Sequence, residues 1–284
     1  MTKGKQLTMM VLLCALLAGG GYFLFTNTEL QELFAGAGGE LESAQIERAL
    51  QNLLEQEPVP GALKIPIFIY HSVRPHIPRE SKRQDEYDIT PELLEKQLAY
   101  LKQNGFTAIT LDELAGDIAA GTTFPHQKPI VLTFDDGWRN QYRYAFPLLK
   151  KYHLTATFYI YTNPIGKKHY LSWDEIKEMD KAGMTIADHT LSHPYFKTIS
   201  LEQIKTEVTE SKKILEQELG KPVLHFASPF GYSNEAIRGI LKDAGYKTAR
   251  TTYKGIYHTK DDLLRLRGIL ISDNFDDFVA VLNR

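Results

Sequence analysis

The sequence predicts an α/β protein: a distorted (β/α) barrel of seven to eight units, preceded by an N-terminal transmembrane helix and a short helical stalk. Apolar runs rich in β-branched and aromatic residues alternate with helical patterns from Ile65 to the end of the chain. This alternation is typical of parallel strands joined by right-handed helical crossovers. Seven or eight such units within about 220 residues fit a closed barrel better than an open sheet.

The N-terminal segment, residues 1–25, is predicted to lie in a membrane. Lys3 and Lys5 precede an uncharged apolar run from Leu7 to Phe25, which is close to the roughly 20 residues that span a bilayer as a helix. Lysines before such a run favour a cytoplasmic N-terminus, with the rest of the chain outside. A retained anchor is favoured because the run exceeds the apolar core of a usual signal peptide, although a cleaved signal peptide stays open. The first alternative predicts a single-pass protein of the cell membrane, and the second a secreted one.

Residues 26–61 are predicted to form a stalk, which leaves residues 62–284 as the folded domain. Gly36, Gly38 and Gly39 make a flexible break, and apolar residues then recur at helical spacing between residues 46 and 54. Pro58 and Pro60 end that helix. We expect it to be a spacer rather than a partner-binding helix.

Within the domain, eight runs have the composition of buried strands. They are Ile65–Tyr70, Phe106–Thr110, Pro129–Phe134, Thr155–Tyr161, Met184–Ala187, Val223–Ala227, Tyr246–Thr251 and Leu266–Ile271. Helices are predicted between most of them, and the first begins with Thr90 as its N-cap and Pro91 at its first position. The others are predicted near Leu111–Ala120, Gln141–Tyr152, Ser172–Ala182, Ser200–Leu219, Asn234–Ala244 and Asn274–Leu282.

The composition excludes two functional classes. A net charge of −2 gives no basic surface for nucleic acid. The single cysteine, Cys14, lies in the N-terminal apolar run, so neither a disulfide framework nor a thiolate metal site can be built. At 43% hydrophobic and 24% charged, the chain is otherwise ordinary for a globular protein.

Polar residues gather just past the ends of the predicted strands. His71 follows the first strand, Asp135 and Asp136 follow the third, His189 follows the fifth, and residues 228–231 follow the sixth. In a barrel of parallel strands, this is the face on which enzymes build their active sites. We therefore expect these side chains to meet there.

Two of these segments have the composition of a metal site. Asp135 and Asp136 are adjacent, and His189 and His193 are four residues apart, a spacing that places both imidazoles on one face of a helical turn. One carboxylate with two histidines is a hydrolytic metal set that leaves coordination positions open for water. The second carboxylate is then free to act as a base. Adjacent aspartates before Gly137 could also be turn chemistry alone, but the histidine pair favours the metal site.

At these residues the chain resembles the polysaccharide deacetylases, carbohydrate esterase family 4, also called the nodulation-deacetylase homology domain. Residues 133–137, Thr-Phe-Asp-Asp-Gly, match the first family motif at every position, and residues 189–194, His-Thr-Leu-Ser-His-Pro, match the second. Residues 226–231 look like the third motif, with departures. The resemblance runs from Pro66 to Ile271, and the first two motifs in this order are specific.

The resemblance implies a role for each matching residue. Asp136, His189 and His193 would bind one divalent metal ion, and Asp135 would be the general base. The backbone N–H of Phe230 would help to stabilise the oxyanion. Zinc suits these ligands, and nickel, cobalt, manganese or iron could also bind.

The chain departs from the family pattern at two points. Ala227 stands where the third motif usually carries an arginine that orients the catalytic aspartate, and the late Leu-x-His motif that supplies the general acid is absent. The first strand is instead similar to that of deacetylases from biofilm poly-N-acetylglucosamine systems, a circularly permuted branch in which a histidine on this strand is the general acid. This resemblance implies His71 as the general acid, with His258 as its rival, and Arg267 as the substitute for the missing arginine.

The implied function is metal-dependent removal of N-acetyl groups from an extracellular N-acetylglucosamine polymer, most closely patterned on poly-β-1,6-N-acetylglucosamine. A peptidoglycan or chitin-like substrate, an O-acetyl ester, and a non-catalytic glycan-binding protein stay open as alternatives. Pro229, Tyr70 and Trp173 are predicted to contact the substrate, although Trp173 could equally be a packing residue. The predicted partners are the polysaccharide, the membrane and a glycan synthase or export machinery.

Overall fold

A computed structural model describes residues 61–76, 87–123 and 125–283. The predicted transmembrane helix and all but the last residue of the predicted stalk lie outside these ranges. Among the helices inside them, none is long and apolar enough to cross a membrane.

All eight predicted strands are present. They are β2 (Ile67–Tyr70), β5 (Thr107–Ala108), β6 (Pro129–Phe134), β7 (Thr157–Ile160), β8 (Thr185–Asp188), β9 (His225–Ala227), β10 (Thr248–Arg250) and β12 (Ile269–Leu270). Seven of them form a parallel sheet in the order β10-β9-β8-β7-β6-β2-β12, and β5 pairs with the start of β6. One bridge between Arg250 and Leu266 connects β10 to the segment before β12. The α/β class and the parallel strands are confirmed. The sheet is a curled half-barrel and not the closed barrel that was predicted, because only one bridge, and no continuous ladder, connects β10 to the segment before β12.

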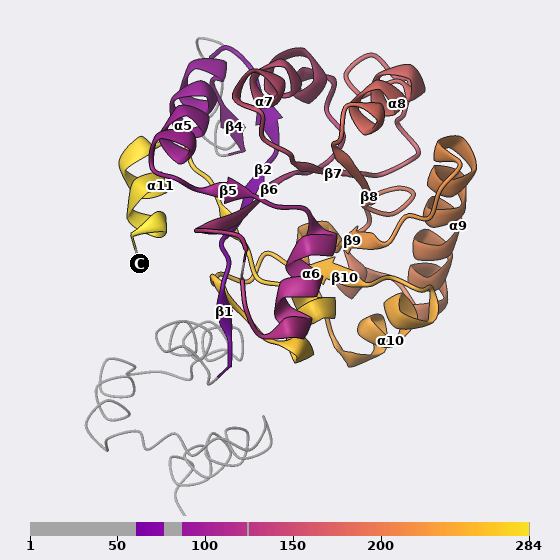
Figure 1. The fold of residues 1–284 in the computed structure, drawn as a ribbon. Helices are drawn as coiled ribbons and strands as arrows, with labels where there is room; N and C mark the ends of the chain where they lie inside the picture. The colour runs from indigo at the N-terminus through magenta and orange to yellow at the C-terminus, as the bar shows by residue number, and fades with distance from the viewer. Residues whose placement is uncertain (1–60, 77–86, 124, 284) are drawn as a thin grey trace, which may run out of the picture. The chain divides into compact units, whose positions relative to one another are not determined.

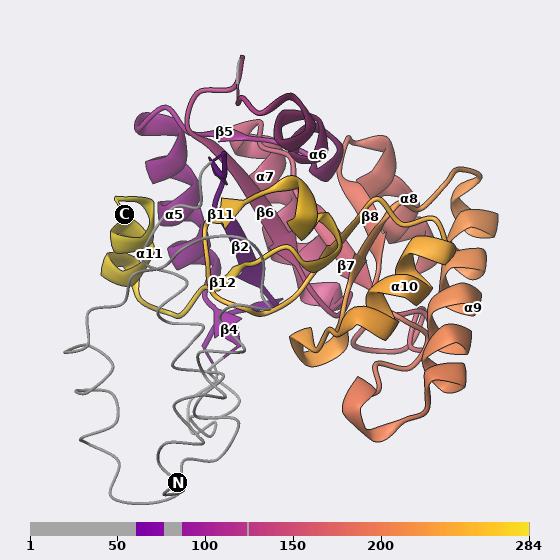
Figure 2. The same ribbon diagram turned by 90° about the horizontal axis from the view of Figure 1, so that it is seen from below.

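The predicted helices are also present, and most of them lie around the outside of the sheet (Figure 1). They are α5 (Pro91–Gln103), α6 (Leu111–Ala120), α7 (Phe146–Tyr152), α8 (Trp173–Lys181), α9 (Leu201–Leu219), α10 (Glu235–Asp243) and α11 (Phe275–Leu282). The helix predicted from Gln141 begins with one π-helical turn, η1 (Gln141–Ala145), which runs into α7. Figure 2 shows α9 and α10 side by side on one flank of the sheet and α5 with α11 on the other.

Several short elements were not predicted, because segments of two to six residues are too short to show a periodicity. The strands are β1 (Leu63–Lys64), β3 (Ser72–Val73), β4 (Asp88–Ile89) and β11 (Tyr257–His258). The 3₁₀ turns are η2 (Phe196–Thr198), η3 (Pro229–Gly231) and η4 (Lys260–Arg265). β1 pairs with β11 antiparallel, and β3 pairs with β4 parallel, directly after His71.

The alternation of side chains along each strand separates the core into layers. Phe68, Phe134 and Phe158 belong to the cluster between the sheet and α5, α7 and α8. Their neighbours in sequence, which include Ile67 and Tyr159, belong to a second cluster that spans strands β2 to β9 and also contains Leu266. Because successive residues of a strand point to opposite faces, the second cluster fills the concave side of the curled sheet. Each strand residue therefore points either to the concave side or to the helices, and only residues of the first kind can contribute to a site on the concave side.

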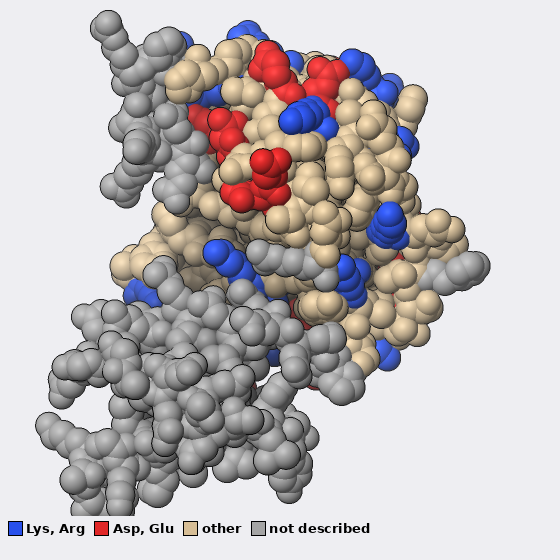
Figure 3. All heavy atoms as spheres, turned by 90° about the vertical axis from the view of Figure 1, so that its left-hand side faces the viewer, with Lys and Arg blue, Asp and Glu red and all other residues tan. Residues whose placement is uncertain are grey.

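The surface on the side of α5 and α11 carries charges of both signs. Figure 3 shows Asp and Glu side chains grouped near the middle of this face, with Lys and Arg side chains around them. This face is not a continuous basic surface of the kind that binds nucleic acid.

Candidate active site

Asp136, His189 and His193 form a compact triangle of potential metal ligands past the ends of β6 and β8. The Nε2 atoms of His189 and His193 lie 3.6 Å and 3.4 Å from Oδ1 of Asp136. Two atoms that each bind one tetrahedral zinc ion at about 2.1 Å lie about 3.4 Å apart. The separations in this triangle thus fit ligands of a single ion.

The protonation of His189 also suits a metal ligand. Its Nδ1 lies 2.7 Å from the carbonyl oxygen of Ala227, so Nδ1 carries the proton and the lone pair is on Nε2, which faces Asp136. Burial lowers the pKa of His189 to about 4, so the imidazole is neutral at pH 7. A neutral imidazole with a fixed tautomer is the form that binds a metal ion.

The two histidines do not lie on a helical turn, and that part of the sequence prediction is wrong. Residues 189–195 form an irregular loop after β8, and Thr190 and His193 have positive φ angles of 77° and 59°. Pro194 disfavours helical backbone at the residue before it. The loop is held instead by side chains: Asp188 accepts a hydrogen bond from the Thr190 N–H at 2.8 Å, and Thr190 Oγ1 accepts one from the His193 N–H at 3.0 Å.

Backbone strain is concentrated in this site. Four of the six non-glycine residues with positive φ in the described part of the chain belong to it: Asp136, Thr190, His193 and Phe230. Each such residue costs about 1–3 kcal/mol, and strain of this kind clusters where function requires it. The positive φ at Asp136 also separates its side chain from that of Asp135, its neighbour. Gly137 follows with φ 66°, and a Cβ there would lie 2.9 Å from Cγ2 of Ile160.

Asp135 is held apart from the metal triangle by other partners. Its N–H donates to the carbonyl oxygen of Tyr70 at 2.9 Å, and its Oδ2 pairs with Nη2 of Arg250. Burial alone would raise the pKa of Asp135, but the charge and the hydrogen bond of the Arg250 guanidinium outweigh burial, and the pKa lies below its ordinary value. Asp135 is therefore ionised at neutral pH, as a general base must be.

Arg250, and not Arg267, orients Asp135, so the prediction for Arg267 is wrong. Arg250 is 1% exposed, at the end of β10, with its guanidinium 5.1 Å from the centre of the Tyr159 ring. Ala249 packs beneath α9 and α10, so Arg250 points to the concave side. Leu266 already occupies the concave side, which turns Arg267 away; its Nη1 lies 3.5 Å from the carbonyl oxygen of Lys254.

The sequence contains a signal for Arg250. It lies in the predicted strand Tyr246–Thr251, at the same end as the other site residues, and it pairs in register with Ala227 on β9. The arginine that the third family motif would carry at Ala227 is thus supplied by the neighbouring strand, β10. A further contact is that of Trp138, whose Nε1–H donates to Oδ2 of Asp136 at 3.1 Å.

His71 approaches Asp135 from the end of β2, whereas the two histidines of the metal triangle follow β8. Its Nε2 is 3.7 Å from Oδ2 of Asp135, and its ring contacts the edge of Tyr87 with centroids 4.9 Å apart. The rival, His258, is fully buried, and its Nε2 lies 3.1 Å from the carbonyl oxygen of Ile65. Ile65 precedes β2 and His71 follows it, so His258 sits about 20 Å away at the other end of the strand. Burial lowers the pKa of His258 to about 4.

The residues predicted to contact substrate are placed differently from one another. Phe230 is 62% exposed, and its ring meets that of His193 with centroids 4.9 Å apart. Pro229 is buried. Tyr70 is 1% exposed and donates to Gln97 of α5 at 3.0 Å, on the convex side of the sheet, so the prediction for Tyr70 is wrong. Trp173 packs against the large core cluster, in agreement with its alternative interpretation as a packing residue.

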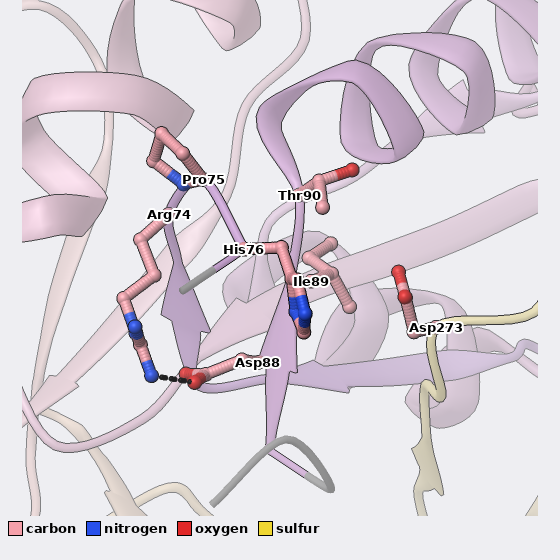
Figure 4. A pocket seen from close by; sticks show the side chains of 7 residues that line it. All are labelled: Arg74, Pro75, His76, Asp88, Ile89, Thr90 and Asp273. Atoms are coloured by element: carbon pink, nitrogen blue, oxygen red, sulfur yellow. Dashed lines mark hydrogen bonds and ion pairs between the residues drawn. The ribbon is translucent and has the colours of Figure 1, made fainter. Parts of the chain in front are cut away.

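A small cavity of about 100 Å³ lies beyond β3, in the segment that follows His71. It is lined by Arg74, Pro75, His76, Asp88, Ile89, Thr90 and Asp273 (Figure 4). Two of these lining residues, Arg74 directly after β3 and Asp88 of β4, form an ion pair. None of the metal triangle or of the Asp135 partners lines it, so the cavity is separate from the site.

A curled parallel sheet with a three-ligand triangle beside an ionised carboxylate defines a class of hydrolase, and comparison with known proteins agrees. Residues 123–249 match the family model described as polysaccharide deacetylase. The solved structure of Streptococcus pyogenes deacetylase PplD in complex with acetate has a TM-score of 0.73 at 30% identity, covering 78% of this chain and 99% of that chain.

Two curated relatives are similar in sequence. The chain is 28% identical over 218 residues to the poly-beta-1,6-N-acetyl-D-glucosamine N-deacetylase of Staphylococcus aureus, which covers 72% of this chain and 74% of that protein. It is 34% identical over 124 residues to the peptidoglycan-N-acetylglucosamine deacetylase of Bacillus cereus, covering 43% of this chain and 56% of that protein. The chain belongs to the polysaccharide deacetylases of carbohydrate esterase family 4, which are hydrolytic de-N-acetylases.

Proposed function

We propose that this protein is a metal-dependent enzyme that removes N-acetyl groups from an extracellular N-acetylglucosamine polymer, poly-β-1,6-N-acetylglucosamine. The observation that carries the proposal is the triangle of Asp136, His189 and His193 beside a second carboxylate, Asp135, that Arg250 keeps ionised. An acetamide is a poor electrophile with a poor leaving group. Its hydrolysis therefore needs an activated water, a site for the negative charge of the carbonyl oxygen, and an acid.

Asp136, His189 and His193 would hold one divalent cation, for which zinc is the best fit and nickel, cobalt, manganese and iron are the alternatives. When bound, the cation would supply Lewis acidity toward the acetyl carbonyl and the attacking water. The hydrogen bond from Trp138 to Oδ2 of Asp136 leaves Oδ1 directed at the two histidines.

The protein's own groups would move the protons. Asp135 would accept a proton from the attacking water at Oδ1, which has no hydrogen-bond partner among the described residues, while Oδ2 stays paired with Arg250. His71 would donate a proton from Nε2 to the nitrogen as the C–N bond breaks, which releases acetate and leaves a free amine on the sugar. The Phe230 N–H would donate to the oxyanion.

Exposed aromatic side chains support a polymeric glycan as the substrate. Phe230 and Tyr195, 62% and 39% exposed, are in contact beside His193, and Tyr87, 45% exposed, lies beside His71. The strands that carry the two histidine segments, β8 and β2, are separated by β7 and β6, so these aromatic rings flank the site on two sides. Exposed apolar patches mark binding surfaces, and aromatic rings pack well against the C–H face of a sugar.

The choice of poly-β-1,6-N-acetylglucosamine is supported by the Staphylococcus aureus relative and by the histidine at the end of the first strand. Peptidoglycan is the second candidate, supported by the shorter similarity to the Bacillus cereus relative. The extracellular location is supported by Lys3, Lys5 and the apolar run that follows them, which would hold the enzyme at the outer face of the membrane near a glycan synthase or exporter.

The test is acetate release by the purified full-length protein from poly-β-1,6-N-acetylglucosamine, chitin oligomers and peptidoglycan, with and without a chelator. We expect release from the β-1,6-linked polymer, loss of activity with the chelator and recovery with zinc. Acetate release mainly from peptidoglycan would make peptidoglycan, and not poly-β-1,6-N-acetylglucosamine, the substrate. Glycan binding without any acetate release would contradict the proposed function.

A further inference from the structure

We propose that Asn140 and Gln141 are positioning residues that set the distance between the general acid and the general base. We call their two side chains the loop clamp. The inference rests on the proposed roles of His71 and Asp135, and it concerns residues outside the metal triangle and outside the carboxylate–arginine pair.

Gln141 joins the backbones of the two proton-transfer residues. Its side chain is fully buried, and its Nε2 donates to the carbonyl oxygen of His71 at 2.7 Å and also to the carbonyl oxygen of Asp135. The register between β2 and β6 ends with the pair Tyr70 and Phe134, and the last backbone bond is from the Asp135 N–H to Tyr70. One side-chain amide therefore continues the connection at the point where the sheet itself stops.

Asn140 binds the two residues that follow His71. Its Oδ1 accepts a hydrogen bond from the Val73 N–H at 3.2 Å, and its Nδ2 donates to Oγ of Ser72 at 2.7 Å. Together the loop clamp holds three consecutive residues, His71 to Val73, against the segment that carries Asp135.

Asn140 and Gln141 lie where a short helical segment changes to a π-helical turn. Gln141 opens the π-helical turn η1, with Asn140 directly before it. Such turns are rare and occur frequently at functional sites, and this one replaces the first part of a helix that the sequence pattern predicts as continuous.

The ring of His71 depends on this backbone connection. Its Nδ1 is buried and has no hydrogen-bond partner among the described residues, whereas Nδ1 of His189 is held by the carbonyl oxygen of Ala227. What remains is the edge contact with Tyr87 and the clamped backbone. The resulting 3.7 Å between Nε2 of His71 and Oδ2 of Asp135 is looser than a direct hydrogen bond and leaves the acid free to face the leaving nitrogen.

The experiment compares two substrates in wild-type protein and in Gln141→Met, which keeps the length of the side chain and removes its donor. An N-acetylated glycan needs a proton on its leaving group, whereas an activated aryl acetate hardly does. We expect kcat on the glycan to fall about 10²-fold, because displacement of a catalytic group by about 1 Å has an effect of that order. The loss on the aryl acetate should be at least about tenfold smaller, with KM and the bound zinc per chain unchanged.

The matched control is Arg143→Gln, an exposed position in the same π-helical turn, which should leave both rates unchanged. Equal losses on the two substrates, or an unchanged ratio of the two rates, would overturn the inference. If Gln141→Met does not fold, Asn140→Ala decides: a selective loss on the glycan supports the loop clamp, and an unchanged ratio rejects it. If wild-type protein hydrolyses the aryl acetate but no N-acetylated glycan, the proposed function has failed instead.

Discussion

Asp136, His189 and His193 come from the ends of two strands, β6 and β8, whereas Asp135, His71 and Arg250 come from three strands, β6, β2 and β10. The metal triangle is contained in two short motifs and is held by strained backbone with local hydrogen bonds. Asp135, His71 and Arg250 are assembled across the concave side of the sheet and are held by a buried ion pair and the loop clamp. We call the metal triangle the metal half of the site and these three residues the proton-transfer half. The two halves should respond differently to substitution.

The largest effect is expected in the metal half. His189→Ala removes a buried ligand whose Nε2 faces Asp136, and the variant should lose most of its bound metal and nearly all of its activity. Elemental analysis of the purified protein measures the first, and about one metal per chain is expected in the wild type. Full retention of metal in His189→Ala would remove this residue from the site.

Asp135→Asn should affect the proton-transfer half alone. The variant removes the base but keeps the shape of the side chain beside Arg250. It should bind metal as the wild type does and lose roughly 10²–10⁴ in rate, the usual contribution of general acid–base catalysis. The measurement is acetate release alongside metal content, and near-wild-type turnover would contradict the role of Asp135.

Arg250→Met tests whether Arg250, and not Arg267, holds the Asp135 carboxylate. Without Arg250 the Asp135 carboxylate is buried and uncompensated, so the free energy of unfolding should fall by about 3–5 kcal/mol. Arg267→Met is the control and should cost less than about 1 kcal/mol, because among the described residues its guanidinium has no carboxylate within ion-pair distance and hydrogen-bonds only to the carbonyl oxygen of Lys254. Urea unfolding of both variants measures this difference. Equal losses in the free energy of unfolding would contradict the assignment of Arg250 as the partner of Asp135.

The smallest effect concerns His258, at the opposite end of the strands. Its pKa is about 4 in the folded protein, against 6.5 for an unperturbed imidazole, because burial disfavours the charged form. The unfolded chain therefore binds more protons than the folded protein between these two pH values. The contribution of His258 to the free energy of unfolding is fully present above pH 6.5, and about 3 kcal/mol is lost as the pH drops toward 4.

His258→Gln should reduce this pH dependence, measured as the free energy of unfolding at pH 7 and pH 4 with a chelator present. Its glycan deacetylation at pH 7 should be close to that of the wild type. A pH dependence identical to that of the wild type would show that His258 does not titrate in this range.

The sequence by itself determined the elements and the metal half. Eight strands and seven helices follow from apolar periodicity and from caps such as Thr90, because these signals are local. Asp136, His189 and His193 could be predicted because their motifs are short and specific, although the reason given for the histidines, a helical turn, was wrong. Pro194 and the hydrogen bonds of Asp188 and Thr190 decided that backbone.

The tertiary structure decided which partners complete the proton-transfer half, because Asp135 and His71 are predicted from the sequence whereas Arg250 and the loop clamp are not. Whether Arg250 or Arg267 meets Asp135 depends on which residue of each strand points to the concave side, and whether Tyr70 lies in the site depends on the same parity. A pattern of apolar residues buried on both faces does not reveal which face is concave. Likewise, Gln141 and His71 are 70 positions apart in the chain, so only the pairing of β2 with β6 brings the amide to that carbonyl.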